Sequence, residues 1–393
     1  MSASLIQASR RNVGAPRIGL PDEINSWQSR LSAFAALCEK RAGEADEQSI
    51  VHPSVVEAFH ALGVAAAPLP TGFGGIGLIE TSEWSALFDT LRTFGAADLS
   101  VGRLFEGHAN AIDLVHRYGT DAQFKKLANA IQGGALTGVW GADGANPLQV
   151  RQVAKGWLLE GGKILASGAG LITRPLVTAG SEAGQRLILL DLKPGERTDL
   201  SGWTPLGMRS SATGSVDLSG LLVSDSRLIG RPGDFMRQPH FSGGAWRFCA
   251  VHLGGAEHLV ELYREQLRQR QRDNDPYQLQ RIATCVSAAG SAAYWIKAAA
   301  RQLALRSEEA EKSVALSNLA RGVTERSALD VMEAVQRGAG LSAFMRANPI
   351  ERVARDLSTY LRQPVPDLAM AEAARFALAD AGSIKDMWDL DEG

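Results

Sequence analysis

The sequence lacks several features that would assign a class of protein directly. Its 393 residues contain no apolar run long enough to span a membrane, and residues 1–19 lack the apolar core of a secretory signal. The formal net charge is -2, which offers no general attraction for nucleic acid or for an anionic membrane. We therefore expect no membrane insertion, no secretory signal and no nucleic-acid partner.

Cysteine is scarce and widely spaced. Only Cys38, Cys249 and Cys285 occur, and none forms a CxxC pair or a spacing typical of metal ligands. This pattern predicts a reducing, cytoplasmic compartment, no metal site, and cysteines that act as small buried apolar residues.

Phosphate-binding motifs are also missing in their usual form. No Walker motif is present, and the glycine-rich run Gly72–Leu78 follows Pro70 instead of a strand. Two further stretches, ASGAGL at 166–171 and QRGAG at 336–340, are equally unspecific alone. Each is explained as well by a turn or a close helix contact that needs glycine.

The hydrophobic pattern changes twice along the chain. Residues 22–133 have helical spacing, with one apolar helix face formed by Trp84, Leu87, Phe88, Leu91 and Phe94. Short β-prone runs separated by turn residues follow over about 135–232, and helical spacing returns from about 240. We predict an N-terminal helical domain (1–134), a central β domain (135–235) and a C-terminal helical bundle (236–393).

Taken in order, the motifs resemble those of the acyl-CoA dehydrogenase family of flavoproteins over nearly the whole chain. The stretch LPTGFGGIGL (69–78) resembles an N-terminal turn of that family, and PLGMRSSATGSVDLSGLLV (205–223) and NPIERVARD (348–356) are the most specific matches. The resemblance implies an α+β multidomain fold with an N-terminal helical domain, a central β-barrel domain and a C-terminal four-helix bundle. It also implies FAD as cofactor and a homodimer or homotetramer.

The resemblance assigns cofactor contacts residue by residue. The implied residues are Trp140, Asp143, Leu165, Ser167, Arg270, Arg272, Gln336, Gly338 and Gly340. Ser167 keeps a hydroxyl where the family has threonine, whereas Leu165 replaces a tryptophan that covers the flavin. The turn from Gln336 to Gly340 would meet the adenosine diphosphate of a neighbouring subunit, and Arg270 or Arg272 would pair with its pyrophosphate. The alternative for each arginine is a solvated helix end.

The catalytic base of the family is missing. Its glutamate stands at one of two positions, which fall here on Pro364 and on Gly244 or Ala245. The remaining candidate catalytic residues are Asp367, His240 and Glu106. Each has a structural alternative: Asp367 as a helix cap, His240 as a surface histidine, and Glu106 on a solvated helix face.

Polar residues replace an apolar pocket floor. Arg103, Glu106, His108 and Asn110 lie on the helix that, by resemblance, lines the acyl pocket. They predict a polar or bulky substrate, with a solvated helix face as the alternative. The loop ADGANPLQV (142–150) is shorter than its family counterpart, which weakens the case for coenzyme A.

Three functions remain open from the sequence, with the first as the leading interpretation and the second as the main alternative. The first is an FAD-dependent oxidoreductase acting on a polar, bulky or carrier-bound acyl thioester, with an electron-transfer flavoprotein as acceptor. The second is a two-component flavin monooxygenase acting on a small molecule and supplied by a flavin reductase. The third is a non-catalytic FAD-binding scaffold. The missing base disfavours a standard dehydrogenase and does not separate the other functions.

Overall fold

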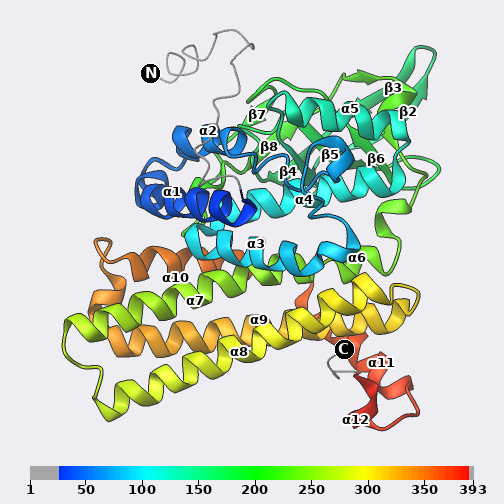
Figure 1. The fold of residues 1–393 in the computed structure, drawn as a ribbon. Helices are drawn as coiled ribbons and strands as arrows, with labels where there is room; N and C mark the ends of the chain where they lie inside the picture. Colours follow the sequence, from blue (N-terminus) through cyan, green and yellow to red (C-terminus); the bar gives the residue numbers. More distant parts are fainter. Residues whose placement is uncertain (1–25, 389–393) are drawn as a thin grey trace.

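The computed structural model describes residues 26–388, so the prediction about residues 1–19 falls outside the described part. The described part begins with a group of helices that Figure 1 shows above the long helices of the C-terminal region. They are α1 (Trp27–Gln48), α2 (Pro53–Ala61), α3 (Trp84–Ala97), α4 (Leu99–Tyr118) and α5 (Asp121–Gln132), with short 3-10 turns η3 (Thr71–Phe73) and η4 (Thr81–Glu83). The N-terminal region is therefore helical, as predicted.

The central region is built from short strands in three sheets. The four-stranded sheet has the order β1-β5-β6-β10, and the three-stranded sheets have the orders β2-β3-β9 and β4-β8-β7. The strands are β1 (Thr137–Trp140), β2 (Gln149–Val153), β3 (Gly156–Glu160), β4 (Gly162–Ala166), β5 (Arg174–Ala179), β6 (Arg186–Leu189), β7 (Thr198–Asp199), β8 (Gly214–Asp217), β9 (Leu222–Val223) and β10 (Leu228–Ile229). The 3-10 turns η5 (Arg209–Ser211), η6 (Asp225–Arg227) and η7 (Asp234–Met236) connect this region. The β region is confirmed, with separate sheets in place of one continuous barrel over residues 26–388.

Long helices form the C-terminal bundle (Figure 1). They are α6 (His240–Gly243), α7 (Trp246–Gln269), α8 (Pro276–Leu305), α9 (Ala310–Ala339), α10 (Pro349–Tyr360), α11 (Pro366–Ala379) and α12 (Ile384–Met387), with the turn η8 (Gly340–Phe344) after α9. Prolines at the first turns of α8, α10 and α11 suit helix starts, where the missing N–H has no intrahelical partner.

The apolar face read from the sequence is the buried face of α3. Leu87, Phe88, Leu91 and Phe94 are at most 2% exposed, and Trp84 packs at the edge of the same core. The three cysteines are free and buried, as predicted. Burial raises the pKa of the Cys249 thiol to about 12, which keeps it uncharged.

Helices α3 and α7 meet through two glycines that face each other's backbone. A Cβ on Gly95 would lie 2.1 Å from the carbonyl oxygen of Val251, and a Cβ on Gly254 would lie 2.0 Å from that of Arg92. No real side chain tolerates such distances, so both positions require glycine. This contact joins the N-terminal helices to the C-terminal bundle.

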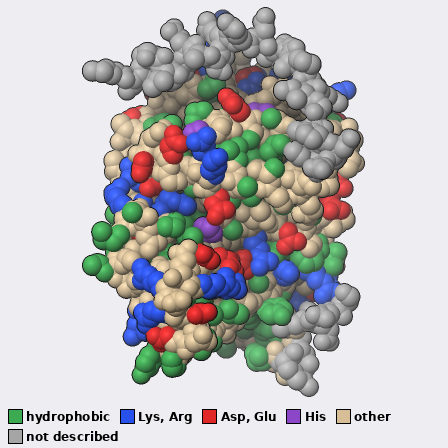
Figure 2. Space-filling model, turned by 60° about the vertical axis from the view of Figure 1, so that its left-hand side comes forward, with side chains coloured by type: hydrophobic (Ala, Val, Ile, Leu, Met, Phe, Trp, Pro, Cys, Tyr) green, Lys and Arg blue, Asp and Glu red, His purple; other side chains and the backbone are tan. Residues whose placement is uncertain are grey.

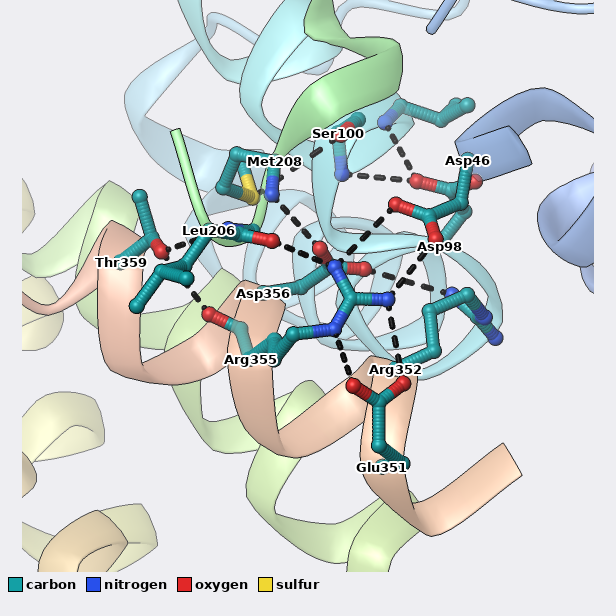
Figure 3. A network of polar contacts seen from close by, with 12 residues as sticks. Asp46, Asp98, Ser100, Leu206, Met208, Glu351, Arg352, Arg355, Asp356 and Thr359 are labelled. Atoms are coloured by element: carbon teal, nitrogen blue, oxygen red, sulfur yellow. Dashed lines mark hydrogen bonds and ion pairs between the residues drawn. The ribbon is translucent and has the colours of Figure 1, made fainter. Parts of the chain in front are cut away.

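A polar network ties the three regions together where α1, α10 and the loop before η5 meet (Figure 3). Arg355 of α10 pairs with Asp46 of α1 at 2.8 Å and also donates to the Leu206 carbonyl. Asp356 accepts a hydrogen bond of 2.6 Å from the Met208 backbone N–H. One helical turn of α10 therefore fixes the position of both the N-terminal and the β region.

This network predicts that stability falls as pH rises toward neutrality. Burial, opposed by Arg352 and reinforced by Asp98, raises the pKa of Asp356 to about 7, against about 3.9 in an unfolded chain. Between those values the folded state holds a proton that the unfolded state has lost, so rising pH favours unfolding. We expect the urea midpoint to drop from pH 5 to pH 8 more steeply in the wild type than in Asp356→Asn, whose side-chain oxygen can still accept from Met208. The exposed Asp367→Asn is the control and should keep the wild-type slope; equal slopes in all three proteins would contradict the prediction.

On the face shown in Figure 2, acidic, basic and hydrophobic side chains are intermixed, and no region of that face is dominated by one charge. Across residues 26–388, every helix is too short or too polar to cross a membrane.

Candidate functional site

A cavity of about 610 Å³ lies where the three regions meet. Its wall is formed by the end of β1, one face of α4, the segment from η7 to the start of α7, the middle of α9, and the connection from α10 to α11. Cavities of this volume are typical of sites for small organic molecules. Because every region contributes to the wall, only the folded chain assembles it.

The α4 side of the cavity is polar and internally paired. Glu106 is 4% exposed and accepts hydrogen bonds from both Arg103 and Asn110, at helical spacings of three and four residues. Asn110 in turn accepts from Arg247 of α7 at 3.1 Å. Burial opposes the charge of Arg103, and the adjacent Glu106 carboxylate more than offsets it, so the pKa of Arg103 is raised.

A second carboxylate continues this ladder along α4. Asp113 pairs with Arg117 at 3.1 Å on its own helix and with Arg247 at 3.0 Å across to α7. The predicted pocket residues Arg103, Glu106 and Asn110 are thus brought together in one cavity wall.

His108 is not brought into this wall. Its Nε2 lies 2.7 Å from the Ala65 carbonyl oxygen, so it carries the proton, and its Nδ1 accepts from the Thr137 backbone N–H at 3.1 Å. Burial lowers the pKa of His108 to about 4, which keeps the ring neutral. The expectation that His108 contacts substrate is corrected: it is a buried link between the N-terminal region and β1.

Both positions expected to hold a catalytic glutamate face the cavity. Pro364 lines it from the α10–α11 connection, and Gly244 and Ala245 line it from the connection between α6 and α7. None of these residues has a side chain that accepts a proton. The carbonyl of Pro364 instead accepts a hydrogen bond of 2.7 Å from Arg321.

The three substitute bases are placed differently. Glu106 lines the cavity and is held by two donors, as described. His240 also lines the cavity, but its Nε2 lies 3.2 Å from an Arg117 nitrogen. Burial is the main cause that lowers the pKa of His240, and the positive charge of Arg117 lowers it further. Asp367 is exposed and lines a smaller adjacent cavity of about 100 Å³ that shares Arg321 with the large one.

On the β side, alternate residues of β1 point in opposite directions. Val139 and Gly141 line the cavity, whereas Trp140 is 1% exposed in the core of the β region. Its indole N–H donates to the Ser167 carbonyl at 3.0 Å and so positions that segment. The predicted flavin contact of the Trp140 ring is therefore corrected: the ring is buried and supports the segment at Ser167.

The neighbouring strand β4 supplies an exposed apolar residue. Leu165 is 60% exposed and has a left-handed φ of 51°, a conformation unusual for leucine. Two residues earlier, the buried Lys163 pairs with Asp143 at 2.6 Å, so Asp143 is held by a structural ion pair. Leu165 and the half-buried Ser167 are the predicted residues left free here for a ligand.

The residues expected at the adenosine end are only partly assembled. Gln336 and Gly338 lie inside helix α9, and only Gly340, with φ of +66°, is in a turn. A Cβ on Gly338 would lie 1.9 Å from the Tyr263 hydroxyl, so this glycine is needed for helix packing. The expected turn from Gln336 is therefore corrected to a helix end at Gly340.

The two candidate arginines at this end also differ. Arg270 donates to Ser342 of η8 at 3.3 Å and so lies beside the end of α9, whereas Arg272 pairs with Asp275 at 2.6 Å, next to the start of α8. Of the two, Arg270 has the position that a phosphate at this end would need.

Sequence reasoning missed Arg321 and Tyr360. Both line the cavity, and the buried Tyr360 hydroxyl lies beside Arg103 but has no acceptor for its proton among residues 26–388. No local motif marks Arg321. Tyr360 could have been proposed from the sequence, because it lies next to the proline-rich segment that replaces the missing base.

Comparison with known proteins gives the family. The sequence model of the acyl-CoA dehydrogenase N-terminal domain matches residues 21–134, and that of the C-terminal domain matches residues 246–362. Isobutyryl-CoA dehydrogenase from Dictyostelium discoideum is 24% identical over 366 residues, covering 88% of this chain and 86% of that protein. Dibenzothiophene monooxygenase from Rhodococcus erythropolis is 27% identical over 233 residues, covering 54% of this chain and 55% of that protein, so its match spans about half of its length.

Solved structures show the same fold. Methanesulfinate monooxygenase from Pseudomonas fluorescens has a TM-score of 0.79 at 20% identity, covering 93% of this chain and 100% of that chain. The protein TdsC from a Paenibacillus species, solved with FMN and indole, has a TM-score of 0.77 at 20% identity, covering 89% and 96%. On these matches, the chain belongs to the acyl-CoA dehydrogenase family of flavoproteins.

Proposed function

We propose that the protein is a flavin-dependent monooxygenase acting on a small organic molecule in the 610 Å³ cavity. The observation that supports this proposal is that Pro364, Gly244 and Ala245 line this cavity, and the family resemblance places the base of a dehydrogenase at these residues. A reduced flavin, made by a separate reductase, supplies two electrons to O₂, so that one oxygen atom enters the substrate and the other leaves as water. This chemistry needs no carboxylate to remove a substrate proton.

The residues of this chain bind and orient the substrate. The paired arginines and carboxylates of α4 form a fixed polar wall, and Val139 and Leu114 add apolar surface. Burial, together with Glu106, raises the pKa of Tyr360 well above its ordinary value, so its hydroxyl keeps its proton. Tyr360 can therefore donate a hydrogen bond to substrate at neutral pH.

The competing function, oxidation of a polar acyl thioester, would need a base, and Glu106 is the candidate carboxylate that lines the large cavity. Glu106 lines the cavity, but Arg103 and Asn110 donate to its two oxygens. Removing a substrate proton would require breaking one of these buried hydrogen bonds. We therefore favour the monooxygenase over this alternative and over a non-catalytic scaffold, which would not require such a cavity.

The cofactor proposed is a flavin whose ring lies between the cavity and strand β4. The fit is supported by Leu165, whose 60% exposed side chain would be covered by a flat ring, and by Gly141, which leaves room at the end of β1. For the distal half, the helical placement of Gln336 and Gly338 gives little support to FAD. We propose FMN as the preferred flavin, with FAD as the competing form.

A titration tests this proposal. The fluorescence of FMN should be quenched when FMN binds to the purified protein at micromolar concentration. FMN should also bind more tightly than FAD. Leu165→Asp should weaken binding by about tenfold, because it places a charge against an apolar ring. Leu222→Asp, at an exposed leucine of β9, is the control. No binding of either flavin would contradict the proposal, and tighter binding of FAD would restore FAD as the cofactor.

Self-association remains a proposal of the family resemblance. It is supported by Val286 and Tyr294, which lie eight residues apart on the outer face of α8 and are 59% and 76% exposed. A light-scattering mass near that of one chain, 41.9 kDa, would contradict it.

A further inference from the structure

Arg321 differs from the other arginines of the cavity in its partners. The other three pair with carboxylates of α4, as described above. The Arg321 guanidinium donates to the Pro364 carbonyl at 2.7 Å and lies 5.5 Å from the centre of the Phe248 ring. Within residues 26–388 it has no carboxylate at ion-pair distance, so its charge is not neutralised by a direct partner.

The charges of the cavity wall do not cancel. The wall contains the cations Arg103, Arg117, Arg247 and Arg321 and the carboxylates Glu106, Asp113 and Glu372, which is four positive against three negative charges. Glu372 is exposed to solvent, where its charge is screened. A half-buried cation whose direct partners are uncharged is stabilised when an anion binds beside it.

An unpartnered donor lies in the same cavity. The Tyr360 side chain is 5% exposed and lines the wall beside Arg103, whose guanidinium interacts with the phenol oxygen. The hydroxyl proton itself has no acceptor within hydrogen-bond distance in the described part of the chain. Buried hydroxyls normally donate to an acceptor, and one that does not is destabilising. A ligand with an acceptor atom at this place would satisfy the Tyr360 hydroxyl.

We propose that the cavity binds an organic molecule carrying a compact oxyanion, such as a carboxylate, which pairs with Arg321 while the Tyr360 hydroxyl donates to the same molecule. This inference rests on the proposed function, because it takes the cavity to be the substrate site. The volume leaves room for an organic body beyond the anionic group, against the apolar side chains of Val139, Leu114 and Leu368. Pro364, which stands where the family resemblance places a negative base, here accepts a hydrogen bond from the positive guanidinium of Arg321.

The test compares two probes of the same shape, 2-naphthoate and its uncharged amide, by calorimetric titration of the full chain. The acid should bind about tenfold more tightly than the amide at low salt, because the carboxylate forms a charge-assisted hydrogen bond with Arg321 that the uncharged amide does not form. Added salt should reduce the difference only partly, because Arg321 is half-buried. Tyr360→Phe should weaken the acid by a smaller factor.

Variants on α9 locate the binding site. Arg321→Gln should bring the two probes to within about twofold of each other, and Arg321→Lys should keep part of the preference because the charge remains. Arg326→Gln, on the same helix but exposed and paired with Asp330, should leave the preference unchanged. If Arg321→Gln does not fold, the lysine variant and the salt dependence of the wild type decide.

The results separate this inference from the proposed function. Equal affinity for the two probes, no binding of 2-naphthoate at millimolar concentration, or a preference that survives in Arg321→Gln would each overturn the inference. Flavin binding is measured on the same preparations. Uptake of FMN without any preference for the acid overturns the inference alone, whereas a preference without flavin uptake overturns the proposed function and leaves the anion site standing.

Discussion

Flavin-loaded protein mixed anaerobically with straight-chain acyl-CoA thioesters, from butyryl to palmitoyl, should keep its oxidised flavin spectrum. General base catalysis typically contributes about 10²–10⁴-fold to such a reaction. Pro364, Gly244 and Ala245 provide no base, and the Glu106 carboxylate is held by two donors. Bleaching by a thioester should therefore be at least about a hundredfold slower than in a family member that retains its glutamate, measured under the same conditions.

Rapid bleaching would contradict this prediction and show that a base exists. The variants Asp367→Asn, His240→Gln and Glu106→Gln would then identify it, because only loss of the true base abolishes flavin reduction while flavin stays bound. Glu106 and His240 already face the cavity, whereas Asp367 would have to move from the smaller cavity beside it.

Gly254→Ala should destabilise the fold by about 3 kcal/mol, at the upper end of the range for overpacked interiors. The added methyl group would lie 2.0 Å from the Arg92 carbonyl oxygen, and that atom belongs to the backbone of α3. A side chain could rotate away, but here the two helices must separate. Chemical denaturation monitored by circular dichroism gives the free energy of unfolding directly.

A matched variant separates this clash from the general effect of alanine in a helix. Gly290 lies in helix α8, and an added Cβ there would meet nothing within 4 Å. Gly290→Ala should therefore stabilise the fold by about 0.5–1 kcal/mol, the helix-propensity difference between the two residues. A free energy of unfolding for Gly254→Ala within about 0.5 kcal/mol of the wild-type value would contradict the close contact of α3 with α7.

The buried face of α3 and the order of helices and strands were predictable, because both depend on residues that are near each other in the sequence. The apolar spacing of α3, from Trp84 to Phe94, marked its buried face because helix periodicity places those residues together whatever they pack against. The order of helices, strands and helices followed in the same way. Pro364 and Gly244, which motif spacing gave as the two positions of the family's base, line the same cavity in the structure.

The remaining features depend on contacts between distant segments. Arg321 lines the cavity because α9 packs beside α7 and because the Arg321 guanidinium donates to the carbonyl of Pro364, 43 residues further along the chain. His108 was misassigned because its helix has two sides, and sequence alone did not show that its ring points to Ala65 and Thr137. Gly338 was read as a turn residue although its role is packing against Tyr263, 75 residues away.

The central claim is that this chain uses its flavin to activate oxygen, and the reaction of the reduced protein with O₂ tests it most directly. Flavin-loaded protein is reduced chemically under anaerobic conditions and mixed with oxygenated buffer in a stopped-flow instrument, with O₂ and the visible flavin band followed together. We predict that O₂ is consumed first and that the oxidised flavin band returns in a later, slower phase. A band that returns in step with O₂ consumption, or a reduced flavin that does not react with O₂ at all, would contradict it.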